Sequence, residues 1–291
     1  MSKLWTKDIE NDFFRKSRDF ASPEQLFYYG DDKRYYAYYP KTYKGIKTTL
    51  QSRNSLIGKF TEKYSVDLLQ DYAKKLNLYA VQDVICDEIG LSRKSPADVA
   101  ICKSKKRIQK PEDIKLLVEV KMSIVWNWEL RNLKKDEKII CLGDFKSHRG
   151  NPGILRSDSM LKAIGKSINI RVSGKTSSKI PIIILGNTPI TENYIEKVDH
   201  LKASGIIQGF WSINPHPLDE DIDNLKQTKE NGFIRMDSYD ELVNNLDKVL
   251  SEPLEFFSSM KSKKELGKLI KISNIEIELE KKAEKFLSLI R

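Results

Sequence analysis

The sequence predicts an α/β fold in which a central mixed sheet of about five strands is flanked by helices. Three observations lead to this prediction. Residues 56–76 carry an apolar side chain at every fourth position, which is typical of an amphipathic helix. Apolar runs of strand length follow at 79–86, at 97–102 and around Glu119. The later run 180–185 is apolar throughout, which suits a central strand covered on both faces.

The first helix is predicted to begin at the capping residues Asn54-Ser55 and to end at Asn77. Its apolar positions are Leu56, Phe60, Tyr64, Leu68, Tyr72 and Leu76. Glu62 lies at the border of a neighbouring apolar stripe. A solvated carboxylate at the helix edge and a role beside a reactive site both fit that position.

Two acids and a lysine stand in strand-like segments where apolar side chains are expected. Side chains alternate along a strand, so Glu119 and Lys121 share one face. A hairpin that sets Asp98 opposite Glu119 also sets Ala100 opposite Leu117, so apolar side chains meet apolar ones. The pattern therefore predicts that the acids meet at one end of the sheet.

Burying ionised groups costs several kcal/mol unless a metal ion or an opposite charge compensates. Asp98, Glu119 and Lys121 therefore predict either a metal site or a structural ion pair. The carboxylates supply the hard oxygen ligands that Mg²⁺ prefers, and together with their apolar flanks they favour the metal site.

With these residues in this order, the segment from Ser55 to Asn187 resembles the PD-(D/E)xK nuclease superfamily. The match is Pro96-x-Asp98 followed by Glu119-x-Lys121, and the family's degenerate motif tolerates Ala97 inside the first part. The resemblance implies a restriction-endonuclease-like core.

The resemblance also implies roles for single residues. Asp98 and Glu119 would bind Mg²⁺, with the main-chain carbonyl of Val120 as a further ligand, and Lys121 would orient the attacking water. Glu62 occupies a first-helix position where some members carry an additional catalytic acid.

An insertion at 122–157 separates the E-x-K strand from a second helix that begins at Ser157-Asp158. A loop this long inside a compact domain is often functional, and we expect it to read DNA. That helix should direct Met160, Leu161, Ile164 and Ile168 inward. The candidate DNA-binding residues of the insertion and the second helix are Lys146, His148, Arg149, Asn151, Arg156, Lys162 and Lys166. A solvated basic loop without a partner is the alternative.

The segments outside the core are an aromatic N-terminal extension, 1–54, and a mostly helical C-terminal part, 218–291. We expect a tyrosine-rich hairpin around Gly30-Asp31-Asp32, with base stacking as the alternative role for its tyrosines. The catalytic core, 55–217, should end with a helix and a further strand. We therefore expect a single nuclease domain covering 1–291.

The formal net charge of +10 and the pI near 9.2 favour a polyanionic partner. Three cysteines without metal-ligand spacing are interpreted as reduced core residues, so no zinc site is indicated. No apolar run approaches the length of a membrane span, and the N-terminus lacks a secretory signal. A cytoplasmic location is expected.

The function that these expectations favour is that of a type II restriction endonuclease. Such an enzyme would hydrolyse double-stranded DNA at a specific sequence with Mg²⁺ and leave 5′-phosphate ends. A palindromic site would imply a homodimer, and the host would need a companion DNA methyltransferase.

Three alternatives remain open at this point. The first is a structure-specific nuclease of repair or recombination, similar to a junction resolvase. The second is a basic DNA-binding protein without catalytic activity, whose carboxylates form only structural ion pairs. A nuclease directed at RNA is less favoured, because the chain has no RNA-binding signature.

Overall fold

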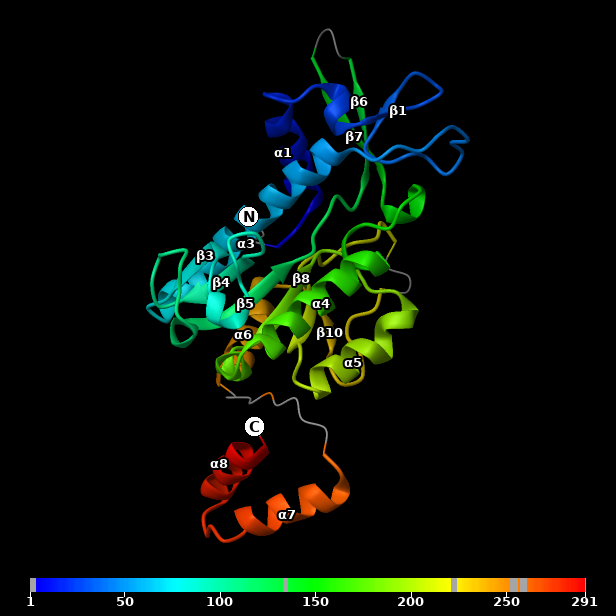
Figure 1. Ribbon diagram of the computed structural model, residues 1–291. Coiled ribbons are helices and arrows are strands. Elements are labelled where there is room, and N and C mark those ends of the chain that lie inside the picture. Colours follow the sequence, from blue (N-terminus) through cyan, green and yellow to red (C-terminus); the bar gives the residue numbers. More distant parts are fainter. Residues whose placement is uncertain (1–3, 133–135, 221–223, 252–255, 257–260, 291) are drawn as a thin grey trace.

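The computed structural model describes residues 4–132, 136–220, 224–251, 256 and 261–290 (Figure 1). Its centre is a six-stranded sheet with the order β10-β9-β8-β5-β4-β3. The strands are β3 (Tyr79–Val84), β4 (Ala97–Cys102), β5 (Ile114–Val120), β8 (Ile182–Gly186), β9 (Gly209–Ser212) and β10 (Phe233–Arg235). Strands β3, β4 and β5 are antiparallel, whereas β5, β8, β9 and β10 run parallel.

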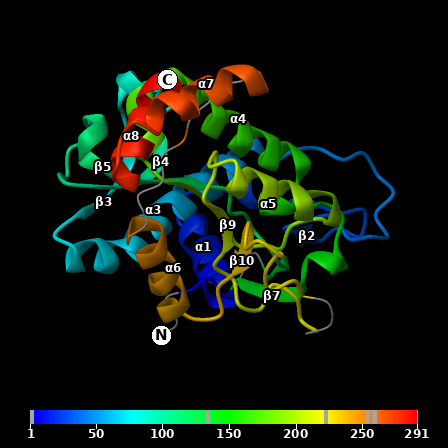
Figure 2. The same ribbon diagram turned by 90° about the horizontal axis from the view of Figure 1, so that it is seen from below.

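Helices cover both faces of this sheet (Figures 1 and 2). The helices α3 (Gln51–Lys75) and α6 (Tyr239–Ser251) lie on one face, and α4 (Ser157–Ser173) and α5 (Ile195–Ala203) on the other. The α/β class is thus confirmed. The sheet has six strands and not about five, because β10 contains only three residues and is too short to show a strand period in the sequence.

A second, four-stranded sheet has the order β1-β2-β6-β7. It joins β1 (Tyr28–Tyr29) and β2 (Tyr35–Tyr36) to β6 (Asn127–Arg131) and β7 (Lys138–Gly143). The predicted tyrosine hairpin is therefore confirmed. The prediction of a continuous loop at 122–157 is wrong, because β6 pairs with β2 and so combines the insertion with the N-terminal extension.

The remaining helices lie at the two ends of the molecule. Helices α1 (Lys7–Arg18) and α2 (Pro23–Leu26) pack beside the four-stranded sheet, while α7 (Lys263–Ser273) and α8 (Leu279–Ile290) form a hairpin that projects from the opposite end (Figure 1). Among the described residues, no helix combines the length and the apolar character needed to cross a membrane.

Two details of the predicted helices are wrong. Asn54-Ser55 do not cap the first helix, because α3 begins at Gln51 and its first turn is held by Arg53, which donates a hydrogen bond to the carbonyl of Ala37. In α4, Leu161 and Ile168 are 62% and 40% exposed, so they do not face inward. The inward face is displaced around the helix and consists of Met160, Ala163, Ser167, Ile170 and Arg171.

Candidate active site

The two acids of the predicted motif meet where β4 and β5 pair. Val99 lies opposite Val118 and Ala100 opposite Leu117, so the predicted register is confirmed. The backbone N–H of Val120 donates a hydrogen bond of 2.8 Å to Oδ2 of Asp98. Asp98 is therefore fixed to β5, the strand that carries Glu119.

Two lysines complete the site, here called the charged cluster: Asp98, Glu119, Lys121 and Lys166. The Nζ atom of Lys121 lies 2.5 Å from Oε1 of Glu119 and 3.6 Å from Oδ2 of Asp98. The Nζ atom of Lys166 lies 2.5 Å from Oε2 of Glu119 and 3.1 Å from Oδ1 of Asp98. Each lysine therefore bridges both carboxylates, and the four formal charges balance.

Lys166 was predicted only as a groove contact, but the structure places it inside the charged cluster. It lies three residues after Ala163 and four before Ile170, both of which are buried on the sheet-facing side of α4. Residues at these spacings are neighbours on a helix surface. The helical period was therefore the signal that assigns Lys166 to the face of α4 that contacts the sheet.

Burial and charge act against one another in the charged cluster. Burial raises the pKa of Glu119, and the charge of Asp98 raises it further, while Lys121 and Lys166 act in the opposite direction. Burial opposes the charged form of Lys166, but the charges of Asp98 and Glu119 outweigh burial and raise the pKa of that ammonium group. The site therefore holds a carboxyl group that is easier to protonate than an ordinary glutamate.

Glu62 and the Val120 carbonyl have other partners than those predicted. Oε2 of Glu62 accepts a hydrogen bond of 2.9 Å from Gln82 on β3, and burial, followed by the charge of Asp98, raises the pKa of Glu62. The carbonyl of Val120 accepts a hydrogen bond of 3.2 Å from Nζ of Lys121. Both groups therefore lie beside the charged cluster and interact with neighbouring side chains.

The chain that follows Lys121 is held by a residue that the sequence interpretation missed. Asn187 is fully buried, and its amide accepts a hydrogen bond from the N–H of Ser123 and donates one to the Ser123 carbonyl, at 3.1 and 2.7 Å. The sequence contained a signal for this role, because Asn187 is a polar residue directly after the apolar strand β8. Gly153, with φ of +54°, passes so close to the Lys121 carbonyl that a Cβ atom would lie 3.1 Å from its oxygen.

The other predicted DNA contacts are spread over the insertion and α4. Lys146 and Asn151 are exposed, and Nε of Arg149 donates a hydrogen bond of 2.9 Å to the carbonyl of Lys41. Arg156 donates two hydrogen bonds of 2.9 Å to Asp158, and Lys162 lies 3.4 Å from the same carboxylate. Contact with nucleic acid stays a prediction for these residues.

The prediction that His148 contacts nucleic acid is not supported by its position, because the side chain is buried. Its side chain is buried, its ring stacks on Tyr38 with the centroids 3.9 Å apart, and Nε2 lies 3.3 Å from the carbonyl oxygen of Val125. Burial lowers the pKa of His148 to about 4, so the ring is neutral at pH 7. His148 joins the insertion to the N-terminal extension.

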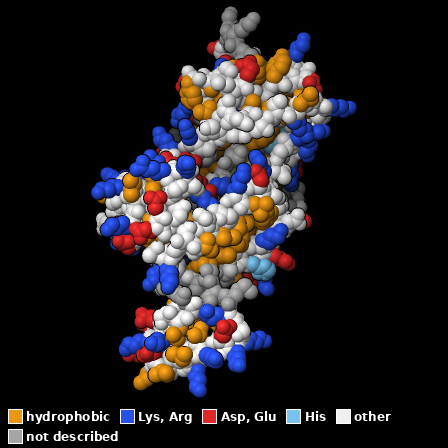
Figure 3. All heavy atoms as spheres, in the orientation of Figure 1, with side chains coloured by type: hydrophobic (Ala, Val, Ile, Leu, Met, Phe, Trp, Pro, Cys, Tyr) orange, Lys and Arg blue, Asp and Glu red, His pale blue; other side chains and the backbone are white. Residues whose placement is uncertain are grey.

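A hollow separates the two ends of the molecule in the space-filling view, and lysine and arginine side chains line it together with a few acids (Figure 3). One end carries the four-stranded sheet and the other the six-stranded sheet. A concave surface of one predominant charge concentrates ligands of the opposite charge.

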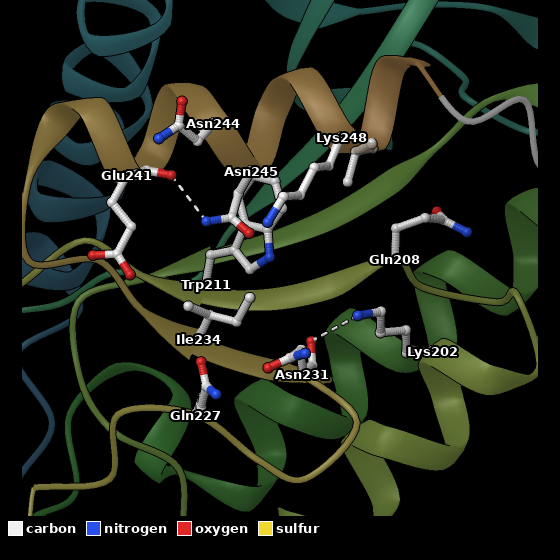
Figure 4. A pocket seen from close by; sticks show the side chains of 11 residues that line it. Lys202, Gln208, Trp211, Gln227, Asn231, Ile234, Glu241, Asn244, Asn245 and Lys248 are labelled. Atoms are coloured by element: carbon white, nitrogen blue, oxygen red, sulfur yellow. Dashed lines mark hydrogen bonds between the residues drawn. The ribbon is translucent and has the colours of Figure 1, made fainter.

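A separate cavity of about 480 Å³ lies under α6 (Figure 4). Trp211 and Ile234 form its apolar floor, and the amides of Gln227, Asn231 and Asn244 line it. Trp211 pairs with Leu185 of β8, which pairs with Val120, so its side chain points to the face opposite Glu119. The cavity and the charged cluster are therefore on different faces of the sheet.

Comparison with known proteins gives one informative similarity. No family model and no solved structure matches the chain. A protein of Methanococcus maripaludis strain C5 named "Putative ribosomal RNA large subunit methyltransferase H" is 28% identical over 149 residues. These residues are 51% of this chain and 75% of that protein.

This similarity contradicts the predicted function. The archaeal protein is named as a methyltransferase of ribosomal RNA, whereas the sequence had predicted a type II restriction endonuclease or another DNA-directed protein. The predicted class of enzyme, a hydrolase of phosphodiester bonds, conflicts with that name as well.

The predicted Mg²⁺ cofactor is corrected together with the function. Within the described residues, no group of three or more His, Cys, Asp or Glu side chains is arranged to hold a metal ion. Asp98 and Glu119 are two acids whose oxygens are paired with Lys121 and Lys166. The structural ion pair, which the sequence had left open, describes their contacts here.

Proposed function

We propose that this protein binds RNA and transfers a methyl group to it. The observation that carries the proposal is the similarity to a protein whose name describes methylation of ribosomal RNA, over about half of this chain. The identity is 28%, so the similarity supplies the reaction class and the substrate class but no residue roles.

The charge distribution supports a nucleic-acid substrate. The chain has a formal net charge of +10, and lysine and arginine side chains line the hollow between its two ends (Figure 3). Lysine and arginine bind phosphates and release counterions, which provides much of the affinity for a polyanion. RNA bound in the hollow would lie across both sheets.

The charged cluster has groups suited to holding RNA and moving a proton. The ammonium groups of Lys121 and Lys166 can donate hydrogen bonds to a phosphate oxygen. To do so, they would give up their present contacts with Glu119. Glu119 has the raised pKa that improves a general base working near neutral pH. In the proposed role, Glu119 accepts the proton that the RNA nucleophile loses.

The methyl donor, such as S-adenosylmethionine, has to bind on the face of the sheet that carries Glu119, because the methyl group passes directly from the donor to the RNA nucleophile. The cavity under α6 has a volume in the range of small-molecule sites, about 300–1,000 Å³, but it lies on the opposite face. It is therefore not assigned to the donor.

The direct test measures transfer of tritium from S-[methyl-³H]adenosylmethionine to ribosomal RNA transcribed in vitro, with double-stranded DNA as the parallel substrate. We expect label in RNA and not in DNA. Glu119→Gln and Lys166→Gln should reduce transfer at least tenfold. Lys229→Gln is the control, since the side chain of Lys229 is 89% exposed and Lys229 belongs neither to the charged cluster nor to the candidate nucleic-acid contacts.

Donor affinity provides the second measurement. Glu119→Gln should leave binding of S-adenosylmethionine in calorimetry unchanged, because in the proposed role Glu119 acts on the RNA nucleophile and not on the donor. Absence of label in RNA, or cleavage of either nucleic acid without label, would contradict the proposed reaction.

The central sheet and two of its helices also suggest a relationship between folds. We infer that β3, β4, β5 and β8, with α3 and α4, form a restriction-endonuclease-like core, as the resemblance of Pro96-x-Asp98 and Glu119-x-Lys121 implies. A fold does not determine a reaction, so this inference about ancestry is independent of methyl transfer. A solved structure that superposes on this sheet with matching strand order would test it.

A further inference from the structure

The cavity under α6 is lined by a buried hydrogen-bond donor that has no acceptor. Trp211 is 2% exposed, and within the described residues no group accepts a hydrogen bond from its indole N–H. A buried indole N–H usually has an acceptor. Gly209 lies two residues before Trp211 on the same face of β9, and a Cβ atom there would collide with Nε1 of the indole. The glycine therefore leaves room at the nitrogen edge of the indole, which can bond to a ligand.

Amide side chains line the same cavity. Those of Gln227, Asn231 and Asn244 form no hydrogen bonds with other described residues (Figure 4). Each amide presents a donor beside an acceptor, which is the pattern that pairs with the amino group and ring nitrogen of adenine. Ile234, which is 8% exposed, adds apolar surface for a ring. These groups suit a planar base with a polar edge better than they suit an apolar molecule.

The charges that line the cavity favour an anion. Lys248 reaches from α6 toward the indole of Trp211, and Lys202 lines the cavity from α5 (Figure 4). Lys248 forms no ion pair with another described residue. Of the described residues that line the cavity, only Glu241 is acidic, and its carboxylate lies 2.7 Å from Nζ of Lys226. The acid is therefore already compensated, so the remaining ammonium groups attract an anionic ligand and repel a metal ion.

We propose that the cavity under α6 binds a free adenine nucleotide with a single phosphate. The base occupies the floor, where Trp211 donates its indole N–H and the amides pair with the polar edge of the ring. Lys248 donates to the phosphate. The volume of about 480 Å³ accommodates a ligand of this size. Because the cavity faces away from Glu119, this site is separate from the charged cluster and independent of the proposed methyl transfer.

Calorimetry of the full chain with AMP, adenosine and inorganic phosphate tests this site. We expect AMP to bind more tightly than adenosine and at least tenfold more tightly than phosphate. Lys248→Gln should weaken AMP binding about tenfold and leave adenosine binding within about twofold, because this lysine contacts only the phosphate. Trp211→Phe keeps an aromatic ring but removes the N–H, so it should weaken AMP and adenosine by the same factor, about fivefold.

Lys16→Gln is the matched control for the loss of one positive charge. Lys16 lies on α1 with its side chain 67% exposed, and Lys248 is exposed as well, so neither substitution should disturb folding. The proposal would be overturned if AMP did not bind at about 1 mM, if phosphate bound as tightly as AMP, or if Lys16→Gln and Lys248→Gln had equal effects. Loss of AMP binding in Lys166→Gln would also overturn it, because the nucleotide would then occupy the charged cluster.

Discussion

Glu10 on α1 and Glu119 on β5 are both buried carboxylates, but they are stabilised by different partners. Glu119 touches two ammonium groups, those of Lys121 and Lys166. Glu10 is fully buried and accepts hydrogen bonds from the indole N–H groups of Trp5 and Trp128 and from two backbone N–H groups. Its partners are dipoles and not cations.

The different partners give the two carboxylates different roles. One of the four donors to Glu10 is Trp5, and the other three are Val125, Trp126 and Trp128. This carboxylate therefore holds the N-terminal segment against the start of β6. The partners of Glu119 are long, partly exposed lysines that can exchange a carboxylate for an incoming phosphate. A carboxylate fixed by rigid N–H groups stabilises a fold, whereas one balanced by mobile charges can also act on a ligand.

The largest effect is expected on the Glu10 side of the comparison. Glu10→Leu leaves four buried N–H groups without their acceptor, at about 1–3 kcal/mol for each unsatisfied group. We expect the free energy of unfolding in urea to fall by about 4 kcal/mol or more. Asp12→Asn, an exposed acid on the same helix, should change it by less than about 0.5 kcal/mol. Equal effects of the two substitutions would show that Glu10 does not hold these segments together.

Much of the Glu119 side was predictable from the sequence, because strand alternation is a local property. The pairing of Asp98 with Glu119 follows from the apolar residues around them, and the structure has that register. The bridge by Lys166 depends on the placement of α4 over the sheet, which the sequence indicates only through a helical period that was assigned to the wrong residues, Leu161 and Ile168.

The Glu10 side was not predictable, because its contacts join segments more than a hundred residues apart. The indole of Trp128 reaches Glu10 only because β6 pairs with β2, and two-residue strands such as β2 have no recognisable pattern. The same pairing explains why the insertion was mistaken for a loop. It also explains the burial of His148, which stacks on Tyr38 of the N-terminal extension.

The second-largest effect is expected when one lysine of the charged cluster is replaced. Lys166→Met leaves two adjacent carboxylates with one ammonium group, and breaking a buried ion pair costs about 3–5 kcal/mol. Because the side chains retain some exposure, we expect about 3 kcal/mol of destabilisation in urea unfolding. Lys162→Met should cost less than about 0.5 kcal/mol. Adding Glu119→Gln to Lys166→Met should recover part of the loss, and no recovery would contradict a direct charge interaction.

The third effect is a pH dependence in which Glu10 and His148 oppose one another. Burial raises the pKa of Glu10 from 4.5 to about 7, so the folded state binds more protons than the unfolded state in this window and stability falls as pH rises. Burial lowers the pKa of His148 from 6.5 to about 4, so the unfolded state binds more protons there and stability rises with pH. Each contribution amounts to about 3 kcal/mol across its window.

Single variants should separate the two contributions. In the wild-type protein they largely cancel between about pH 4.5 and 6.5. Glu10→Gln should leave a stability that rises with pH over this range, and His148→Phe one that falls. Urea midpoints measured at half-unit pH intervals test both slopes, and a slope of the opposite sign in either variant would refute the assigned burial effect.

The smallest effect is expected at Glu62. This half-buried side chain accepts a hydrogen bond from Gln82 on β3. Glu62→Gln keeps the hydrogen-bonding shape, so unfolding free energy should change by less than about 1 kcal/mol and methyl transfer by less than twofold. A loss of transfer comparable to that of Glu119→Gln would place Glu62 within the reacting groups.

Nucleoside mass spectrometry of RNA tests the central claim most directly. Ribosomal RNA is incubated with the purified chain and S-adenosylmethionine, digested to nucleosides and compared with RNA treated with the Glu119→Gln variant. The account predicts one nucleoside that gains a methyl group only with the wild-type chain, while the RNA stays intact before digestion. Identical nucleoside profiles, or fragmented RNA without a methylated nucleoside, would contradict it.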